Sequence, residues 1–278
     1  MDSVANILRD LDFRFNKQFG QNFITDTNLL SSMVADSGIT SEDVVVEIGA
    51  GAGTLTRALS KVAKRVIAFE IDNNLRQVLD ITLRGLEDNV EVVFKDIMKV
   101  SSTELAEIVG SEKYKVVANL PYYITTPIIM MFLESDYRPT SLSIMVQKEV
   151  AERLVAKPNT SDYGSISAVV DLEANASITR IVKRDMFYPV PKVDSAVVKL
   201  DIVDGKYNCN KSKVKSLIKA SFAMRRKTLV NNLLALGYTR SVIEKSITDI
   251  GLDIRVRGEV LGVKEFIALS EALEKNVL

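Results

Sequence analysis

The chain has 278 residues, 47% of them apolar, and its 36 basic side chains are balanced by 36 acidic ones. It contains no histidine and a single cysteine, Cys209. Ser-His-Asp hydrolysis, imidazole acid-base chemistry, His-based metal sites, Cys-rich zinc sites and an intrachain disulfide are therefore excluded. Any catalysis must depend on positioning, hydrogen bonding and an activated cosubstrate.

The start of the chain, MDSVANILRDLDFRF, lacks the apolar stretch of a signal peptide, and no run approaches a transmembrane span. We therefore expect a cytoplasmic protein that does not bind membranes. Residues 1–177 carry 17 basic and 25 acidic residues, a net charge of −8, whereas residues 178–278 carry 19 and 11, a net charge of +8. The basic C-terminal part favours a polyanionic partner, although by itself this bias is also typical of an ordinary solvated surface.

Short apolar segments alternate with helical patterns along the first 200 residues. The expected strands are 43–48, 65–69, 90–94, 115–118, 141–146, 169–172, 177–182 and 196–202. Helices are expected at 54–62, 73–83 and 148–156. This alternation predicts the α/β class, with a doubly wound parallel sheet.

A polar segment at 203–210 (VDGKYNCN) is a plausible linker. Only helical patterns follow it, at 211–222, 228–236, 240–249 and 263–276. We expect two domains: residues 1–205 form the sheet domain, and residues 206–278 form a small, all-helical domain.

A glycine-rich loop, EIGAGAG at 47–53, follows the first expected strand and precedes a helix. Glycines permit close approach of the backbone to a ligand, and the helix N-terminus adds partial positive charge. Glu70 ends the next strand, where its carboxylate could hold both ribose hydroxyls, and Asp96 follows the third, where it could accept a hydrogen bond from adenine. A dinucleotide site shares the loop and the acidic residue but adds a third glycine at its own spacing, which is absent here. These residues therefore favour S-adenosylmethionine, which has no pyrophosphate, over NAD.

The segment KVVANLPYYI, at 115–124, is an apolar strand that ends in Asn119-Leu120-Pro121-Tyr122. An exocyclic amine of a nucleobase is a poor nucleophile, because its lone pair is delocalised into the ring. The Asn119 side-chain oxygen and the Leu120 carbonyl are suitable acceptors for such an NH2 group, and Tyr122 offers a stacking face. Taken alone, the tetrad is equally typical of a strand that ends in a proline turn.

Taken together, the motifs of this chain resemble those of the rRNA adenine N6,N6-dimethyltransferases of the KsgA type. In order they are KQFGQNF (17–23), EIGAGAGTLT, FEID, KDIM, NLPYYI, QKEVAERLVAKP (147–158), DYGSIS (162–167), FYPVPKVDSAVV (187–198) and FAMRRKTLVNNL (222–233). The last motif extends beyond a generic methyltransferase core. The chain has NLPYY where many relatives have NLPYN, and Met224 where a polar residue is common, but we expect neither position to do chemistry.

The resemblance implies a Rossmann-like class I methyltransferase domain followed by a small helical domain. It implies metal-free, S-adenosylmethionine-dependent dimethylation of two adjacent adenosines in a hairpin loop near the 3′ end of 16S rRNA. The partner would be a partly assembled small ribosomal subunit, and the protein a monomer.

The resemblance also assigns site residues. Cofactor contacts would be Asn22, Ile24, Gly49, Gly51, Glu70, Asp96 and Asn119. The target adenine would be held by Asn119, Leu120, Pro121, Tyr122 and Phe187, although Phe187 could instead be a core aromatic residue. Arg225, Arg226 and Lys227 would contact RNA phosphates, and a solvated basic turn is the alternative there.

Two other functions are compatible with this fold. One is a macrolide-resistance type methylase of 23S rRNA, against which the C-terminal motifs argue. The other is a non-enzymatic nucleic-acid-binding factor. The presence of Glu70, Asn119 and Tyr122 favours an enzyme, because a pure binding module has no need of them.

Overall fold

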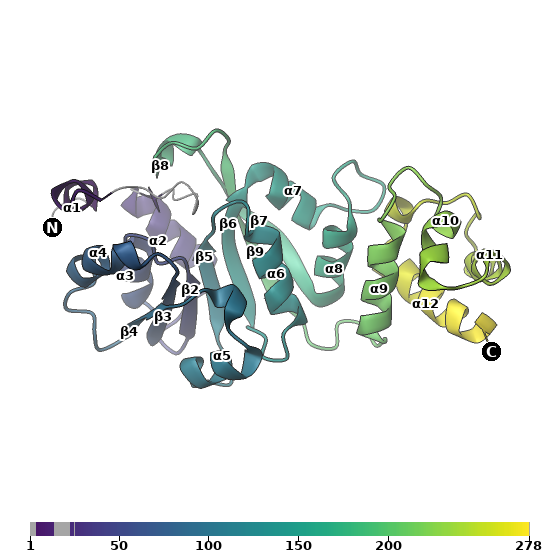
Figure 1. The fold of residues 1–278 in the computed structure, drawn as a ribbon, viewed down its shortest axis with the longest axis horizontal. Helices are drawn as coiled ribbons and strands as arrows, with labels where there is room; N and C mark the ends of the chain where they lie inside the picture. The colour runs from purple at the N-terminus through teal and green to yellow at the C-terminus, as the bar shows by residue number, and fades with distance from the viewer. Residues whose placement is uncertain (1–3, 14–22, 25, 278) are drawn as a thin grey trace. The chain divides into compact units, whose positions relative to one another are not determined.

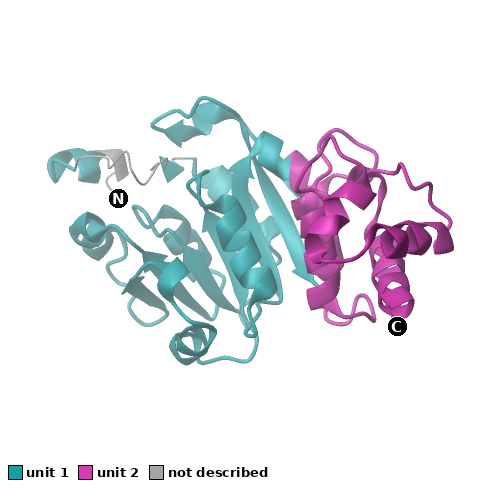
Figure 2. Ribbon diagram, turned by 45° about the vertical axis from the view of Figure 1, so that its right-hand side comes forward, with its two compact units in different colours: residues 1–151, 177–202 teal, residues 152–176, 203–278 magenta. Residues whose placement is uncertain are grey.

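The computed structural model describes residues 4–13, 23–24 and 26–277. Figure 1 shows the order of the elements along the chain. The residues group into two compact units (Figure 2). Unit 1 comprises residues 1–151 and 177–202, and unit 2 comprises residues 152–176 and 203–278.

Unit 1 is built on a seven-stranded sheet with the order β4-β3-β2-β5-β6-β9-β7. Its strands are β2 (Val44–Ile48), β3 (Arg65–Glu70), β4 (Val90–Phe94), β5 (Lys115–Asn119), β6 (Ser141–Gln147), β7 (Ala174–Val182) and β9 (Ser195–Ile202). Strands β2 to β6 run parallel, whereas β9 pairs antiparallel with β6. The strand order reverses between β2 and β5, and open sheets of this kind bind ligands at the carboxyl ends of the strands beside that point.

The helices of this part of the chain are α1 (Val4–Asp10), α2 (Thr27–Asp36), α3 (Thr54–Ser60), α4 (Arg76–Thr82), α5 (Ser102–Val109), α6 (Thr125–Glu134) and α7 (Lys148–Val155). Short 3-10 turns lie at η2 (Asn73–Leu75), η3 (Ile97–Lys99) and η4 (Arg184–Met186). Several begin at an acidic or hydroxyl cap: Asp26 caps α2 and Ser101 caps α5, each accepting backbone N–H bonds.

A second sheet has two short strands, β1 (Phe23–Ile24) and β8 (Phe187–Tyr188). They pair antiparallel, with Ile24 opposite Phe187. Both of these side chains are buried in one apolar cluster with residues of α2 and α3.

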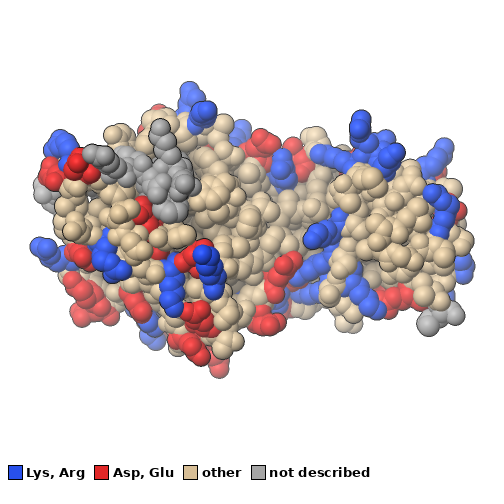
Figure 3. All heavy atoms as spheres, in the orientation of Figure 1, with Lys and Arg blue, Asp and Glu red and all other residues tan. Residues whose placement is uncertain are grey.

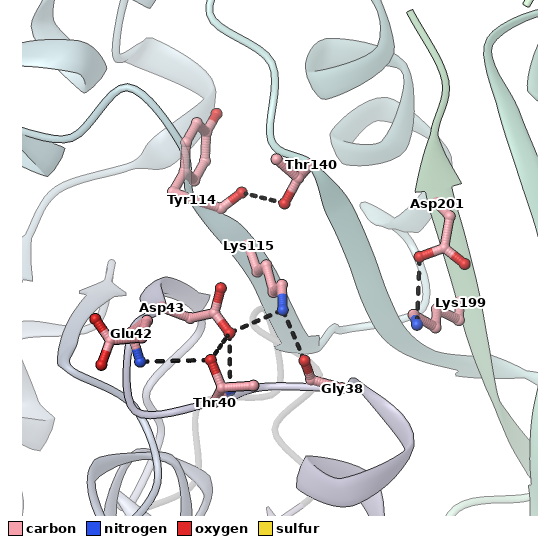
Figure 4. Close-up of polar contacts among 9 residues, drawn as sticks. All are labelled: Gly38, Thr40, Glu42, Asp43, Tyr114, Lys115, Thr140, Lys199 and Asp201. Carbon is pink, nitrogen blue, oxygen red and sulfur yellow. Dashed lines mark hydrogen bonds and ion pairs between the residues drawn. The ribbon is translucent and has the colours of Figure 1, made fainter.

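The amino end of β5 is fixed by polar contacts (Figure 4). The Lys115 ammonium donates to the Gly38 carbonyl at 2.6 Å and to Asp43 Oδ2 at 2.8 Å. These bonds tie the first residue of β5 to the segment between α2 and β2. The opposite, carboxyl end of the same strand carries Asn119.

Unit 2 is helical apart from the first residues of β7. Its helices are α8 (Ser165–Glu173), α9 (Lys211–Ser221), α10 (Leu229–Leu233), α11 (Arg240–Asp249) and α12 (Val263–Val277), with 3-10 turns η5 (Leu234–Leu236) and η6 (Gly258–Val260). The division expected from composition, at residue 205, differs from this one because residues 152–176 group with the helices that follow. Tyr163 explains the grouping: its hydroxyl donates to the Leu261 carbonyl at 2.9 Å, and its ring lies 5.8 Å from that of Phe222.

The strand expected at 169–172 is wrong, because these residues lie within helix α8. Ala168, Val169, Val170 and Leu172 are all buried, so this apolar run shows neither a helical nor an alternating pattern of polarity. Ser167 lies in the first turn of the helix, where its hydroxyl accepts from the Gly164 N–H at 3.1 Å and donates to the Arg153 carbonyl at 2.6 Å. The other expected strands and helices fall within three residues of observed elements.

Candidate active site

The loop between β2 and α3 depends on glycine. Gly49, Gly51 and Gly53 have φ angles of 78°, 58° and 77°, which L side chains rarely adopt. A Cβ at Gly51 would also lie 2.9 Å from the Phe23 ring. The backbone N–H of Gly49 donates to the Phe69 carbonyl at 2.8 Å, so the loop is held against the end of β3.

Glu70 ends β3 and is nearly buried. Its Oε2 accepts from the Gly51 N–H at 2.8 Å. Its Oε1 accepts from the Ile71 and Asp72 N–H groups, both at 2.8 Å. Burial raises the pKa of this carboxyl and the backbone hydrogen bonds oppose that shift. The carboxylate is therefore held in one orientation beside the glycine loop.

Asp96 follows β4, as expected from the sequence. Its Oδ1 accepts from the Met98 N–H at 3.1 Å and caps the turn η3. The cap leaves acceptor capacity on the carboxylate for a ligand, since each carboxylate oxygen can accept more than one hydrogen bond.

The Asn119-Leu120-Pro121-Tyr122 tetrad forms the turn between β5 and α6. Leu120 is buried, and the Ile124 N–H donates to the Pro121 carbonyl at 3.2 Å, which closes the turn. The Tyr122 ring is half-buried, and its hydroxyl lies 2.9 Å from Ser195 Oγ at the start of β9. Burial raises the pKa of Tyr122, so the residue stays a neutral phenol at physiological pH.

These elements surround a cavity of about 270 Å³ in unit 1. The sequence-predicted site residues that line it are Ile24, Gly49, Gly51, Glu70, Asp96, Asn119, Leu120, Pro121, Tyr122 and Phe187. Asn22, also expected at this site, lies outside the described residues. Phe187 is 3% exposed and belongs to the apolar cluster of the core, so the same residue contributes both to the packing and to the cavity wall.

Glu47 also lines the cavity, and its environment could not be read from the sequence. The side chain is completely buried, and neither carboxyl oxygen makes a hydrogen bond to any described residue. Burial raises its pKa to about 8, and the nearby Glu70 charge reinforces this effect. A buried acceptor without a partner fits a ligand that carries positive charge.

The basic residues expected to contact RNA, Arg225, Arg226 and Lys227, lie in unit 2, in the turn between α9 and α10. The buried Asn232 side chain holds this turn: its Oδ1 accepts from the Met224 N–H at 3.1 Å, and its Nδ2 donates to the Ser221 carbonyl at 2.8 Å. Arg225 bonds within the unit, to the Ser161 carbonyl and to Glu259 at 3.5 Å.

Arg226 and Lys227 are exposed and form no ion pair with any residue that the structure describes. Figure 3 shows Lys and Arg side chains gathered along the upper edge of unit 2. By composition unit 2 has 16 basic and 12 acidic residues, a net charge of +4, and unit 1 has 20 and 24, a net charge of −4. Unit 2 is thus basic and unit 1 acidic, as expected from the sequence, but the net charges of the units are half those of residues 1–177 and 178–278.

Comparison with known proteins assigns the chain to a family. The family model described as "Ribosomal RNA adenine dimethylase" matches residues 12–275. The chain belongs to the ribosomal RNA adenine dimethylase family. This confirms the resemblance stated above, the enzyme class and the methyltransferase fold.

Two relatives of this dimethylase carry the name "Ribosomal RNA small subunit methyltransferase A". The protein of Clostridioides difficile (strain 630) is 42% identical over 280 residues, which cover 99% of this chain and 96% of the relative. That of Enterococcus faecalis (strain ATCC 700802 / V583) is 45% identical over 281 residues, which cover 98% and 95%.

Solved structures agree with this assignment. A dimethyladenosine transferase from Plasmodium falciparum matches with a TM-score of 0.74 at 26% identity, covering 91% of this chain and 98% of that one. The 23S rRNA methyltransferase ErmE matches with a TM-score of 0.70 at 25% identity, covering 91% and 99%. Fold similarity therefore extends to a dimethyladenosine transferase and to a 23S rRNA methyltransferase, and it does not identify the RNA that this chain methylates.

In the described parts of this dimethylase, none of the helices has the length and apolar character needed to cross a membrane. Those same parts contain no group of three or more His, Cys, Asp or Glu residues that could hold a metal ion.

Proposed function

We propose that this dimethylase transfers methyl groups from S-adenosylmethionine to the N6 amines of two adjacent adenosines near the 3′ end of 16S rRNA. It acts in the cytoplasm, as a monomer, on a partly assembled small ribosomal subunit. The observation that carries the proposal is that Glu70 with the glycine loop and the Asn119–Tyr122 turn line the same cavity. The names of the two relatives support the choice of the small subunit.

The side of the cavity beside β2, β3 and β4 suits the cofactor. Glu70 offers acceptors to both ribose hydroxyls, Asp96 to the adenine amine, and the unpartnered Glu47 carboxyl to a positively charged group. The glycine loop allows the backbone to lie against the ligand. When bound, S-adenosylmethionine supplies a methyl group activated by its sulfonium.

The side beside β5 suits the target base. The Asn119 side-chain oxygen and the Leu120 carbonyl would accept hydrogen bonds from the N6 hydrogens, so that the nitrogen lone pair is directed toward the methyl group. Tyr122 would stack on one face of the adenine and Phe187 on the other. Methyl transfer is then an in-line displacement that depends on proximity and orientation.

A paired adenine cannot enter this cavity, so the base must be in a loop or flipped out of its stack. Dimethylation also requires that the cavity accept an N6 nitrogen that already bears one methyl group. The product of the first transfer must therefore rotate or rebind before the second. Neither requirement calls for a metal ion or a histidine.

The small ribosomal subunit would be bound by the turn between α9 and α10 of unit 2, which carries Arg226 and Lys227 and is called the basic turn below. Because unit 1 is acidic, it cannot hold RNA by general attraction, and Arg226 and Lys227 are free of ion pairs with the described residues. Asn232 fixes the turn that presents them. Structured RNA is recognised largely through shape and phosphate contacts, which such a preformed basic turn provides.

The test is to map N6,N6-dimethyladenosine in rRNA of both subunits from cells with and without the gene. The proposal requires that two adjacent modified adenosines in small-subunit rRNA disappear with the gene and return with the wild-type copy but not with Asn119→Ala. Loss of a large-subunit modification instead would identify the macrolide-resistance type of activity. No change in either rRNA would favour a non-enzymatic factor.

A further inference from the structure

Tyr123 has no role in the proposed methyl transfer, yet it lines the same cavity as Tyr122. Its side chain is 60% exposed, whereas Tyr122 is half-buried. Single exposed apolar side chains are common on protein surfaces and by themselves mean nothing. Tyr123 differs from those because its exposed side chain also lines the cavity.

The turn explains why two consecutive tyrosines differ. Leu120 anchors the chain in the core on one side of the turn, and the hydrogen bond from Ile124 to Pro121 closes it. The Tyr122 hydroxyl is bound to Ser195. Tyr123 makes no hydrogen bond to any residue in the described ranges, so its ring is held at the mouth only by the backbone of the turn.

We propose that Tyr123 is a second stacking position, which holds the nucleotide next to the adenosine bound against Tyr122. The inference rests on the proposed function, in which the two targets are adjacent in one strand. Consecutive Cα atoms are only about 3.8 Å apart, so neighbouring bases can reach neighbouring side chains. Every base has a π-face, and stacking on an aromatic ring therefore holds the neighbour whatever its identity.

This position would strengthen binding of the RNA strand without selecting the neighbouring base. The neighbouring base is extracted from its own stack when the first adenosine enters the cavity, and the Tyr123 ring replaces part of the stacking that it loses. Tyr123 would thus act on binding of the RNA and leave the cofactor and the transfer step unaffected.

The experiment uses small subunits purified from cells that lack the gene. Methylation rates are measured against subunit concentration for the wild type and for Tyr123→Phe, Tyr123→Leu and Tyr123→Ala, with S-adenosylmethionine affinity measured separately. Loss of the aromatic ring in Tyr123→Leu and Tyr123→Ala should raise KM for subunits by about tenfold, whereas Tyr123→Phe should stay near the wild type. Cofactor affinity should be unchanged in all three. Ile181→Ala is the control, because Ile181 is exposed in the same unit but does not line the cavity.

If Tyr123→Ala has the KM of the wild type, or if Tyr123→Leu behaves like Tyr123→Phe, stacking at this position is wrong. A parallel loss of cofactor affinity would also overturn the inference, since Tyr123 would then belong to the cofactor site. Failure of the wild-type protein to methylate adjacent adenosines at all would instead refute the proposed function.

Discussion

The hydroxyl groups of Tyr122 and Ser195 lie 2.9 Å apart, although the two residues are 73 positions apart in the sequence. Ser195 is completely buried at the first position of β9, and it faces Gln147 across the antiparallel pair with β6. The hydrogen bond therefore joins the turn after β5 to the start of β9, an interior strand of the sheet. It fixes the phenol end of the ring that we propose stacks on the target base.

Ser195→Ala should slow methyl transfer by up to about tenfold, the effect of removing one hydrogen bond, and leave cofactor affinity unchanged. Tyr122→Phe removes the same bond from the other side. If loss of this hydrogen bond causes the slower methyl transfer, the double variant should be no slower than the slower of the two single variants. Independent, additive losses in this double-mutant cycle would show that Ser195 acts on something other than Tyr122.

Glu70→Ala should weaken binding of S-adenosylmethionine by about 1–3 kcal/mol, because the variant cannot make charged hydrogen bonds to the ribose. The same change frees the Gly51 N–H from its acceptor, so the glycine loop should also loosen. Calorimetric titration with S-adenosylmethionine and with NAD measures the first effect, and Glu107→Ala, at an exposed position, is the control. Tight binding of NAD without binding of S-adenosylmethionine would contradict the assignment of this site.

Glu47 should make the free protein less stable as pH rises. Its pKa is about 8 in the folded state against an ordinary value of 4.5, so between these pH values the folded state holds a proton that the unfolded state has released. The contribution of Glu47 to the free energy of unfolding is fully present below pH 4.5 and is lost as the pH rises to about 8. Glu47→Gln should remove that loss, and urea unfolding at pH 6 and pH 8 checks it. An equal pH dependence in both proteins would mean that Glu47 is ionised when folded.

Replacing Arg226 and Lys227 together by Ala should raise KM for subunits and flatten its salt dependence. The logarithmic slope should fall by roughly 0.7–0.9 for each RNA phosphate that the variant no longer neutralises. Arg225→Ala should act differently, because this side chain bonds to Ser161 and Glu259 within the unit and contributes to holding the turn. Cofactor affinity should change in neither. If the double variant methylates subunits like the wild type across a range of salt, docking by this turn is refuted.

The positions of Glu70, Asp96 and Asn119 could be predicted because each ends a strand or lies within two residues of its end, and the carboxyl ends of parallel strands meet on one side of a sheet. The contact of Ser195 with Tyr122 could not be predicted, because it depends on the antiparallel register of β6 and β9. The isolation of Glu47 is likewise a property of the packed interior. The strand expected at 169–172 is wrong because consecutive residues of α8 are buried, which hides the helical periodicity of the sequence. The grouping of 152–176 with unit 2 depends on contacts such as that of Tyr163 with Leu261.

The most direct test of the central claim compares purified wild-type protein with Asn119→Ala on unmethylated small subunits, using S-adenosylmethionine with a labelled methyl group. Asn119 would accept a hydrogen bond from the reacting amine, so its loss should abolish transfer while the fold and most of the cofactor affinity remain. We expect label in N6,N6-dimethyladenosine at two adjacent positions with the wild type and none with the variant. Near-normal turnover by Asn119→Ala, or label at another atom or in another RNA, would contradict it.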